Sequence, residues 1–210
     1  YDPANDIRFL EIELDMWVLG IITRGWEKTA RALQQEKGAV VKALAKQLSG
    51  LNVTEGLVEE LTKKLKFDLE KPGDWTDEQL KSLAVHIRKK SKPMIIAANK
   101  MDLPTADANL KRIQKEFPDY PIIPVSAEAE LTLRSAHKAG LITYLPGDGD
   151  FAAKGNLSPK QLEALEYIRK NVLKKYGNTG TQKVLNTAVL DLLKYMAIFP
   201  GGVNKLADKD

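Results

Sequence analysis

A short apolar run that ends abruptly on polar residues limits the fold of this chain more than any other stretch. Residues 94–98 follow Pro93 and lead directly into Asn99-Lys100-Met101-Asp102. Five apolar residues without polar alternation are typical of a strand buried on both faces of a parallel sheet. Open α/β sheets bind ligands at the carboxyl ends of such strands, so the polar tetrad has a favourable place for a binding site.

Helical periodicity fills the chain before this run, and strands alternate with helices after it. Apolar residues three and four apart predict only helices over residues 24–91, whereas residues 121–125 form a second short apolar run that ends on Ser126. Alternation of strands and helices is typical of parallel sheets. We therefore predict an α/β fold with a partial parallel sheet, into which an all-helical subdomain is inserted.

Local signals place several element ends. Two pairs of residues have the three-residue spacing of a capping box: Thr76 with Gln79, and Ser158 with Gln161. We expect Asn5 or Asp6 to cap the first helix. The glycine-rich residues 144–156 are expected to form a surface loop, and residues 195–199 a last strand.

Composition limits the classes of function. The chain has 210 residues, of which 43% are hydrophobic, enough for one large domain or two small ones. It contains no cysteine, which excludes disulfides and thiolate metal sites and fits a reducing, cytoplasmic location. No apolar run approaches the roughly 18 residues of a membrane span, so no membrane contact is expected. A net charge of +4 permits contact with nucleic acid without requiring it, and we expect no DNA specificity.

Asp102 and its neighbours have the chemistry to recognise guanine. An ionised Asp102 accepts hydrogen bonds and donates none, and guanine presents two adjacent donors, N1–H and its exocyclic amine. Adenine has an acceptor in place of N1–H, so the same carboxylate would discriminate against it. Lys100 can lay its aliphatic stem along the base, and Asn99 can brace the loop. The alternative is a surface turn in which Asp102 only helps to cap the next helix.

The tetrad resembles the guanine-reading NKxD motif of P-loop GTPases. In GTPases of this kind a backbone N–H of a second, SA-containing loop reaches guanine O6, and Ser126-Ala127-Glu128 would be that loop here. We expect Glu128 to support the loop or cap a helix, with a contact to the base as the alternative. The predicted guanine-binding residues are therefore Asn99, Lys100, Asp102, Ser126, Ala127 and Glu128.

Sequence signatures for phosphate binding are missing from this chain. Neither G-x-x-x-x-G-K-[ST] nor a D-x-x-G switch sequence occurs, and the nearest imitation, residues 147–155, has the wrong spacing and two carboxylates that would repel phosphate. His86 and His137 fall on different predicted helices, so neither is expected to bind a metal or to catalyse. We expect GTP or GDP as the ligand and no catalytic residue or metal ligand in this chain. Mg²⁺ is expected only together with a phosphate-binding half, and we expect no hydrolysis by this segment alone.

The chain resembles the carboxyl-side portion of a YchF-type, Obg-related P-loop GTPase. Besides the tetrad, residues 2–7 resemble the family's D-P-x-x-D-I stretch, and residues 126–134 resemble its extended SA segment. The resemblance implies a P-loop NTPase-like G domain, with the P-loop half before Tyr1. It implies four segments: a G-domain helix (1–23), a helical insertion (24–91), the carboxyl-side part of the G domain (92–194) and the start of a truncated TGS-like domain (195–210).

Two hypotheses of function follow. In the first, the chain is the guanine-binding segment of a GTPase, and the resemblance implies ribosome or rRNA association through basic residues of the helical insertion. Those residues include Arg24, Lys28, Arg31, Lys42, Lys46, Lys63, Lys64 and Lys66, interspersed with glutamates. In the second, the chain is a helical protein- or RNA-binding module in which the nucleotide loops are vestigial.

Overall fold

The computed structural model describes residues 2–34, 39–196 and 198, and the chain divides into two compact units, Tyr1–Met94 and Ile95–Asp210. Each unit has a hydrophobic core of its own. The helix over residues 3–23 belongs to the first unit, together with the helices that follow it. The four segment boundaries expected from the sequence stay predictions.

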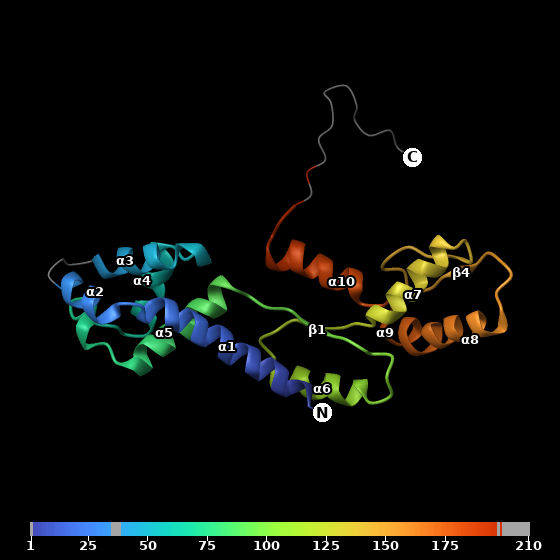
Figure 1. The fold of residues 1–210 in the computed structure, drawn as a ribbon, viewed down its shortest axis with the longest axis horizontal. Helices are drawn as coiled ribbons and strands as arrows, with labels where there is room; N and C mark the ends of the chain where they lie inside the picture. Colours follow the sequence, from blue (N-terminus) through green and yellow to red (C-terminus); the bar gives the residue numbers. More distant parts are fainter. Residues whose placement is uncertain (1, 35–38, 197, 199–210) are drawn as a thin grey trace, which may run out of the picture. The chain divides into compact units, whose positions relative to one another are not determined.

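The first unit consists of helices and turns in its described part (Figure 1). In chain order these are α1 (Pro3–Thr23), α2 (Trp26–Leu33), α3 (Ala39–Gln47), the 3-10 turn η1 (Ser49–Leu51), α4 (Glu55–Lys64), the 3-10 turn η2 (Pro72–Asp74) and α5 (Asp77–Ser91). The core of this unit includes stacked indole rings, because the Trp26 and Trp75 centroids lie 5.2 Å apart. Phe67 meets Trp75 edge-on, with the ring centroids 4.5 Å apart.

Both predicted capping boxes are confirmed. Gln79 N donates to Thr76 Oγ1 at 3.2 Å and Thr76 N donates to Gln79 Oε1 at 2.8 Å, at the start of α5. Ser158 and Gln161 make the same reciprocal pair at 3.3 and 2.9 Å. These pairs satisfy N–H groups that a helix leaves without intrahelical acceptors at its first turn.

The predicted cap of α1 at Asn5 or Asp6 is wrong. Asp2 caps the helix instead, because its Oδ1 accepts from Ala4 N at 2.9 Å. Pro3 supplies the physical reason: its fixed φ suits the first helical position and it has no N–H to satisfy there. The helix therefore begins earlier than the apolar periodicity alone indicated.

A buried arginine joins α1 to α5. Arg88 is 1% exposed, and its Nε donates to Asp15 Oδ1 at 2.8 Å. Its Nη2 lies 3.5 Å from Glu11 Oε1. A guanidinium is costly to bury without charged partners, so these two carboxylates of α1 determine which face of α5 packs against it.

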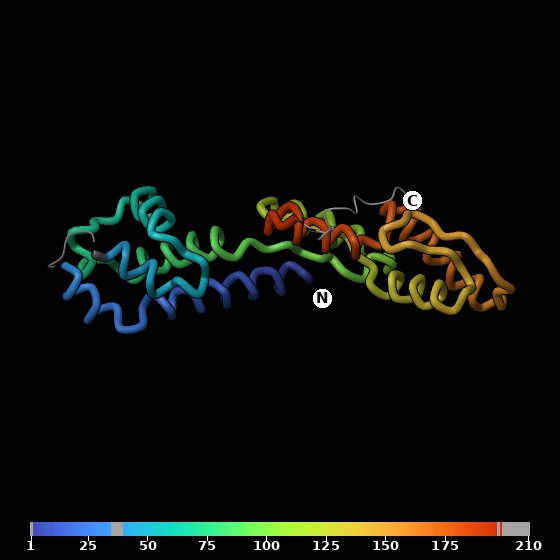
Figure 2. The backbone as a smooth tube through the Cα atoms, turned by 90° about the horizontal axis from the view of Figure 1, so that it is seen from above, coloured from blue at the N-terminus to red at the C-terminus, as the bar shows by residue number. Residues whose placement is uncertain are grey.

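The second unit alternates strands and helices. In chain order these are β1 (Ile96–Ala98), α6 (Ala106–Glu116), β2 (Ile122–Pro124), α7 (Ala127–Lys138), β3 (Ile142–Thr143), β4 (Ala152–Ala153), α8 (Pro159–Ile168), the π-helical turn η3 (Arg169–Leu173), α9 (Lys174–Tyr176), α10 (Thr181–Asn186) and the π-helical turn η4 (Thr187–Leu192). α7 and α8 lie side by side in Figure 1 and Figure 2. Their facing residues, such as Leu133 and Leu165, belong to one core.

The predicted parallel sheet is confirmed in small form. β1 and β2 pair in parallel, with Ile96 opposite Ile122 and Ala98 opposite Pro124. The expected loop over residues 144–156 is partly wrong, because Ala152–Ala153 pairs antiparallel with Ile142–Thr143. A two-residue strand is too short to produce a period in the sequence.

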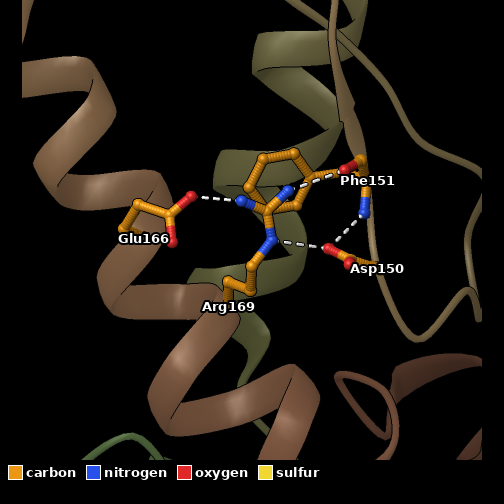
Figure 3. A network of polar contacts seen from close by, with 4 residues as sticks. All are labelled: Asp150, Phe151, Glu166 and Arg169. Carbon is orange, nitrogen blue, oxygen red and sulfur yellow. Dashed lines mark hydrogen bonds and ion pairs between the residues drawn. The ribbon is translucent and has the colours of Figure 1, made fainter.

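One arginine fixes the segment around β4 to α8 and η3 (Figure 3). Arg169 Nε donates to Asp150 Oδ1 at 2.6 Å and Nη2 donates to Phe151 O at 2.7 Å. Nη1 also donates to Glu166 Oε1, and the guanidinium carbon lies 3.9 Å from the centre of the Phe151 ring. The planar guanidinium thus holds a carboxylate, a carbonyl and an aromatic face together.

The strand predicted over residues 195–199 is wrong for the residues that can be described. Tyr195, Met196 and Ile198 lie in no strand, and residues 197 and 199 lie outside the described residues. Among the described ranges, every helix is too short or too polar to cross a bilayer.

Candidate functional site

Two loops meet at the carboxyl edge of β1 and β2. The first follows Ala98 and contains the polar tetrad; the second follows Pro124 and contains Ser126. Backbone pairing continues past both strands, because Val125 N donates to Ala98 O at 2.8 Å and Met101 N donates to Val125 O at 3.1 Å. Met101 is buried, so its side chain anchors the tetrad to the protein interior. The parallel pairing places both loops where α/β sheets bind ligands.

Asn99 ties the two loops together. Its Oδ1 accepts from Lys100 N at 2.8 Å and from Ala127 N, in the second loop, at 3.1 Å. Lys100 has a φ of 64°, a left-handed conformation that a residue with a Cβ adopts at a cost of about 1 kcal/mol or more. The two hydrogen bonds that Asn99 Oδ1 accepts, from Lys100 N and from Ala127 N, hold this turn against the second loop.

Asp102 is positioned by two hydroxyl groups. Ser126 Oγ donates to Asp102 Oδ1 at 2.8 Å, and Tyr167 of α8 donates its hydroxyl to the Asp102 backbone O at 2.9 Å. Ser126 is 1% exposed, whereas Asp102 is only partly buried. A carboxylate has two oxygens and about four acceptor positions, so the bond from Ser126 leaves acceptor capacity on the exposed side.

Five of the six predicted site residues line one pocket. It has a volume of about 400 Å³ and is lined by Asn99, Lys100, Asp102, Leu103, Ala127, Glu128 and Leu131. Ser126, the sixth, lies behind the pocket wall and contacts it through Asp102. Glu128 is exposed in the first turn of α7, where N–H groups lack intrahelical acceptors. The pocket thus combines two carboxylates, Asp102 and Glu128, with one lysine stem and the backbone at a helix start.

A buried network supports the second loop from the side away from the pocket. Ser126 N donates to Thr179 O at 2.9 Å, and Thr179 Oγ1 donates to Glu130 Oε2 at 2.5 Å. Glu130 also accepts from the Tyr144 hydroxyl at 2.7 Å and from Arg134 Nε at 2.6 Å. Thr179, Tyr144 and Glu130 are all less than 5% exposed.

The charge state of this network follows from its hydrogen bonds. Burial acts to raise the pKa of Glu130, but the bonds donated by Thr179, Tyr144 and Arg134 outweigh it and hold that pKa below its usual value. Burial, and then the bond to the Glu130 carboxylate, raise the pKa of Tyr144 to about 12. Glu130 is therefore ionised and Tyr144 neutral at physiological pH.

The sequence did not point to these supporting residues. In the sequence, Gly177 and Gly180 flank Asn178-Thr179. Both glycines have positive φ values, 83° and 80°. Paired glycines around a polar dipeptide signal an unusual backbone path, but nothing local identifies what that path contacts.

No cluster of metal ligands is found in the described part of the chain, where no three His, Asp or Glu side chains gather in a suitable arrangement. Asp107 instead pairs with Lys175 and accepts from the Tyr176 hydroxyl at 2.5 Å, joining α6 to α9.

Comparisons with known proteins identify relatives over the whole chain. A family model described as "Obg-like GTPase YGR210-like, G4 motif-containing domain" matches residues 97–202. The chain is 46% identical over 210 residues to an uncharacterized GTP-binding protein of Methanocaldococcus jannaschii, covering 100% of this chain and 52% of that protein. It is 31% identical over 210 residues to an uncharacterized GTP-binding protein of Schizosaccharomyces pombe, covering 95% of this chain and 50% of that protein.

A solved structure is also similar. The crystal structure of a GTP binding protein from Pyrococcus horikoshii OT3 superposes with a TM-score of 0.76 and 40% sequence identity, covering 99% of this chain and 56% of that chain. The chain therefore spans about half the length of the curated relatives it matches.

Proposed function

Because the chain belongs to the Obg-like GTPase YGR210-like family through its G4 motif-containing domain, we propose that the pocket at the edge of β1 and β2 binds the guanine base of GTP or GDP. The observation that carries the proposal is the 2.8 Å bond between Ser126 Oγ and Asp102 Oδ1. It holds the carboxylate in place beside the amides that begin α7. The assignment to the YchF branch in particular stays a prediction.

In this proposal Asp102 selects guanine by accepting from N1–H and the exocyclic amine. A charged acceptor facing two donors makes a strong, geometrically specific pair, and adenine lacks the first donor. The Lys100 stem covers one face of the base. Guanine O6 is then recognised by a backbone N–H in the first turn of α7, that of Glu128, because Ala127 N already donates to Asn99 Oδ1.

We assign base recognition, and no chemical step, to the residues of this pocket. Phosphate binding, Mg²⁺ coordination and hydrolysis need groups that neutralise phosphate charge, and no phosphate-binding signature occurs within the 210 residues. The curated relatives are about twice as long, so hydrolysis is proposed only for a protein of that length.

Calorimetric titration of the full-length protein with GDP and ADP tests base recognition. Wild type should prefer GDP, and Asp102→Ala should lose about 100-fold in GDP affinity, because two hydrogen bonds to a charged group are removed. The matched control is Asp191→Ala, which removes an exposed carboxylate of η4 that lies outside the pocket. An unchanged ratio of GDP to ADP affinity in Asp102→Ala would contradict the proposal.

A second candidate function is binding of the first unit to ribosomal RNA. Exposed lysines end two of its helices: Lys63 and Lys64 in the last turn of α4, and Lys89 and Lys90 in the last turn of α5. Phosphate contacts by such groups make binding depend on salt. Replacing Lys63 and Lys64 with Glu reverses their charge and should weaken ribosome binding and reduce its dependence on salt. An unchanged affinity would count against RNA binding by this unit.

A further inference from the structure

We propose that Thr179 and Glu130 determine how strongly the pocket recognises guanine O6, by fixing the Ser126 loop from behind. This inference rests on the proposed function and assigns a positioning role to two residues that are not among those lining the pocket. The three residues form a closed ring of hydrogen bonds: Ser126 N to Thr179 O at 2.9 Å, Thr179 Oγ1 to Glu130 Oε2 at 2.5 Å, and Glu130 N to Ser126 O at 3.1 Å.

The ring is buried and its members cannot exchange their partners for water. Thr179 and Ser126 are each 1% exposed and Glu130 is 4% exposed. A buried carboxylate that loses one hydrogen-bond donor still bears the free-energy cost of its removal from water. Breaking one bond of the ring is therefore expected to shift the groups that make its other bonds. Ser126 is the N-cap residue of α7 and Glu130 lies in the first turn of that helix, so the ring fixes the start of α7.

Gly180 makes this close approach possible. Its φ is 80°, and a Cβ placed there would collide with the Pro124 carbonyl at the end of β2. Gly180 N also donates to Asn178 Oδ1 at 2.8 Å, which tightens the turn. The backbone at Thr179 therefore reaches the second loop only because the next residue has no side chain.

The two sides of the base differ in how they are held. Asp102, which faces N1–H and the amine, is held through its backbone O by the Tyr167 hydroxyl at 2.9 Å, a bond independent of the ring, and through its carboxylate by Ser126 Oγ. The Glu128 amide at the start of α7, which faces O6 in this proposal, depends on the ring for its position, whereas Ala127 N is held by Asn99 Oδ1 at 3.1 Å. Loosening the ring should therefore weaken recognition of O6 more than recognition of the amine.

Three diphosphates separate these contacts in titrations of the full-length protein. IDP lacks the amine of GDP, whereas 6-thio-GDP replaces O6 with a larger and weaker acceptor. Thr179→Val removes the hydroxyl donor with little change of shape, and Glu130→Gln removes the charge. Each should lower the preference for GDP over 6-thio-GDP by about fivefold, while the preference for GDP over IDP changes less than about twofold. Thr179→Ser keeps the donor and should behave like wild type.

The outcomes separate this inference from the proposed guanine recognition on which it rests. The positioning role would be overturned if a variant lowers both affinity ratios, GDP over 6-thio-GDP and GDP over IDP, by the same factor. It would also be overturned if the variants lower neither ratio. If wild type itself fails to prefer GDP over IDP, the proposed guanine recognition fails, whatever the variants do. Thermal melting is measured on every variant, and Glu130→Gln carries the comparison if Thr179→Val does not fold.

Discussion

Replacing Gly180 with alanine should destabilise the second unit much more than the same change at Gly177. Both glycines have φ values near 80°, so an alanine at either position adopts a left-handed conformation at a cost of about 1–2 kcal/mol. Around Gly177 nothing lies within 4 Å of an added Cβ, so the backbone conformation is the whole cost there.

At Gly180 the added methyl group meets backbone that cannot rotate away. It collides with Pro124 O and lies 3.1 Å from Val125 Cα, so the 179–180 turn must move off β2. That movement breaks the bond from Ser126 N to Thr179 O, about 1 kcal/mol, and weakens the charged bond to Glu130, about 1.5–3 kcal/mol. We expect a loss of about 3.5–6 kcal/mol in unfolding free energy for Gly180→Ala, against about 1–2 kcal/mol for Gly177→Ala.

Urea unfolding followed by far-UV circular dichroism measures the two losses. Hydrogen exchange locates the change, because the Ser126 amide should lose protection in Gly180→Ala and keep it in Gly177→Ala. Equal destabilisation by the two substitutions, or an unchanged Ser126 amide in Gly180→Ala, would refute the packing argument.

Two further predictions concern the buried charges. Replacing both Asp15 and Glu11 with alanine removes two acceptors from the buried Arg88 guanidinium and should lower the unfolding free energy by about 2–3 kcal/mol. Tryptophan fluorescence measures this loss, because all three tryptophans lie in the first unit. A loss below about 0.5 kcal/mol would contradict the role of the two carboxylates. The pKa of Tyr144, about 12, exceeds its unfolded value near 10, so its contribution to stability is complete below about pH 10 and is lost as the pH rises through 12. Absorbance titration should show one tyrosine that ionises only near pH 12, absent from Tyr144→Phe, and a uniform titration near pH 10 would exclude the buried bond to Glu130.

The parts of the site that the sequence predicted are those fixed by strand adjacency. An apolar run ending on Asn99-Lys100-Met101-Asp102 and another ending before Ser126 can meet only if the two strands are parallel neighbours, and the 2.8 Å bond from Ser126 to Asp102 follows from that pairing. Capping boxes were predictable for a similar reason, because their two residues are always three apart.

The parts that the sequence did not predict depend on long-range contacts. Tyr167 reaches Asp102 across 65 residues, and Thr179 reaches Glu130 across 49 residues. Neither contact leaves a period or a motif, because a hydroxyl on a helix and a threonine in a turn are ordinary local choices. The predicted cap of α1 was wrong for a local reason: the prediction named Asn5 or Asp6, whereas Pro3 occupies the first helical position and makes Asp2 the cap.

The affinity ratio of Asp102→Asn for XDP and GDP tests the central claim most directly. An asparagine side chain presents one donor and one acceptor, which match the C2 carbonyl and N1–H of xanthine, whereas the carboxylate matches the two donors of guanine. If Asp102 reads the base, wild type should prefer GDP and Asp102→Asn should prefer XDP, each by about tenfold or more. The same order of affinities in wild type and variant would contradict the account.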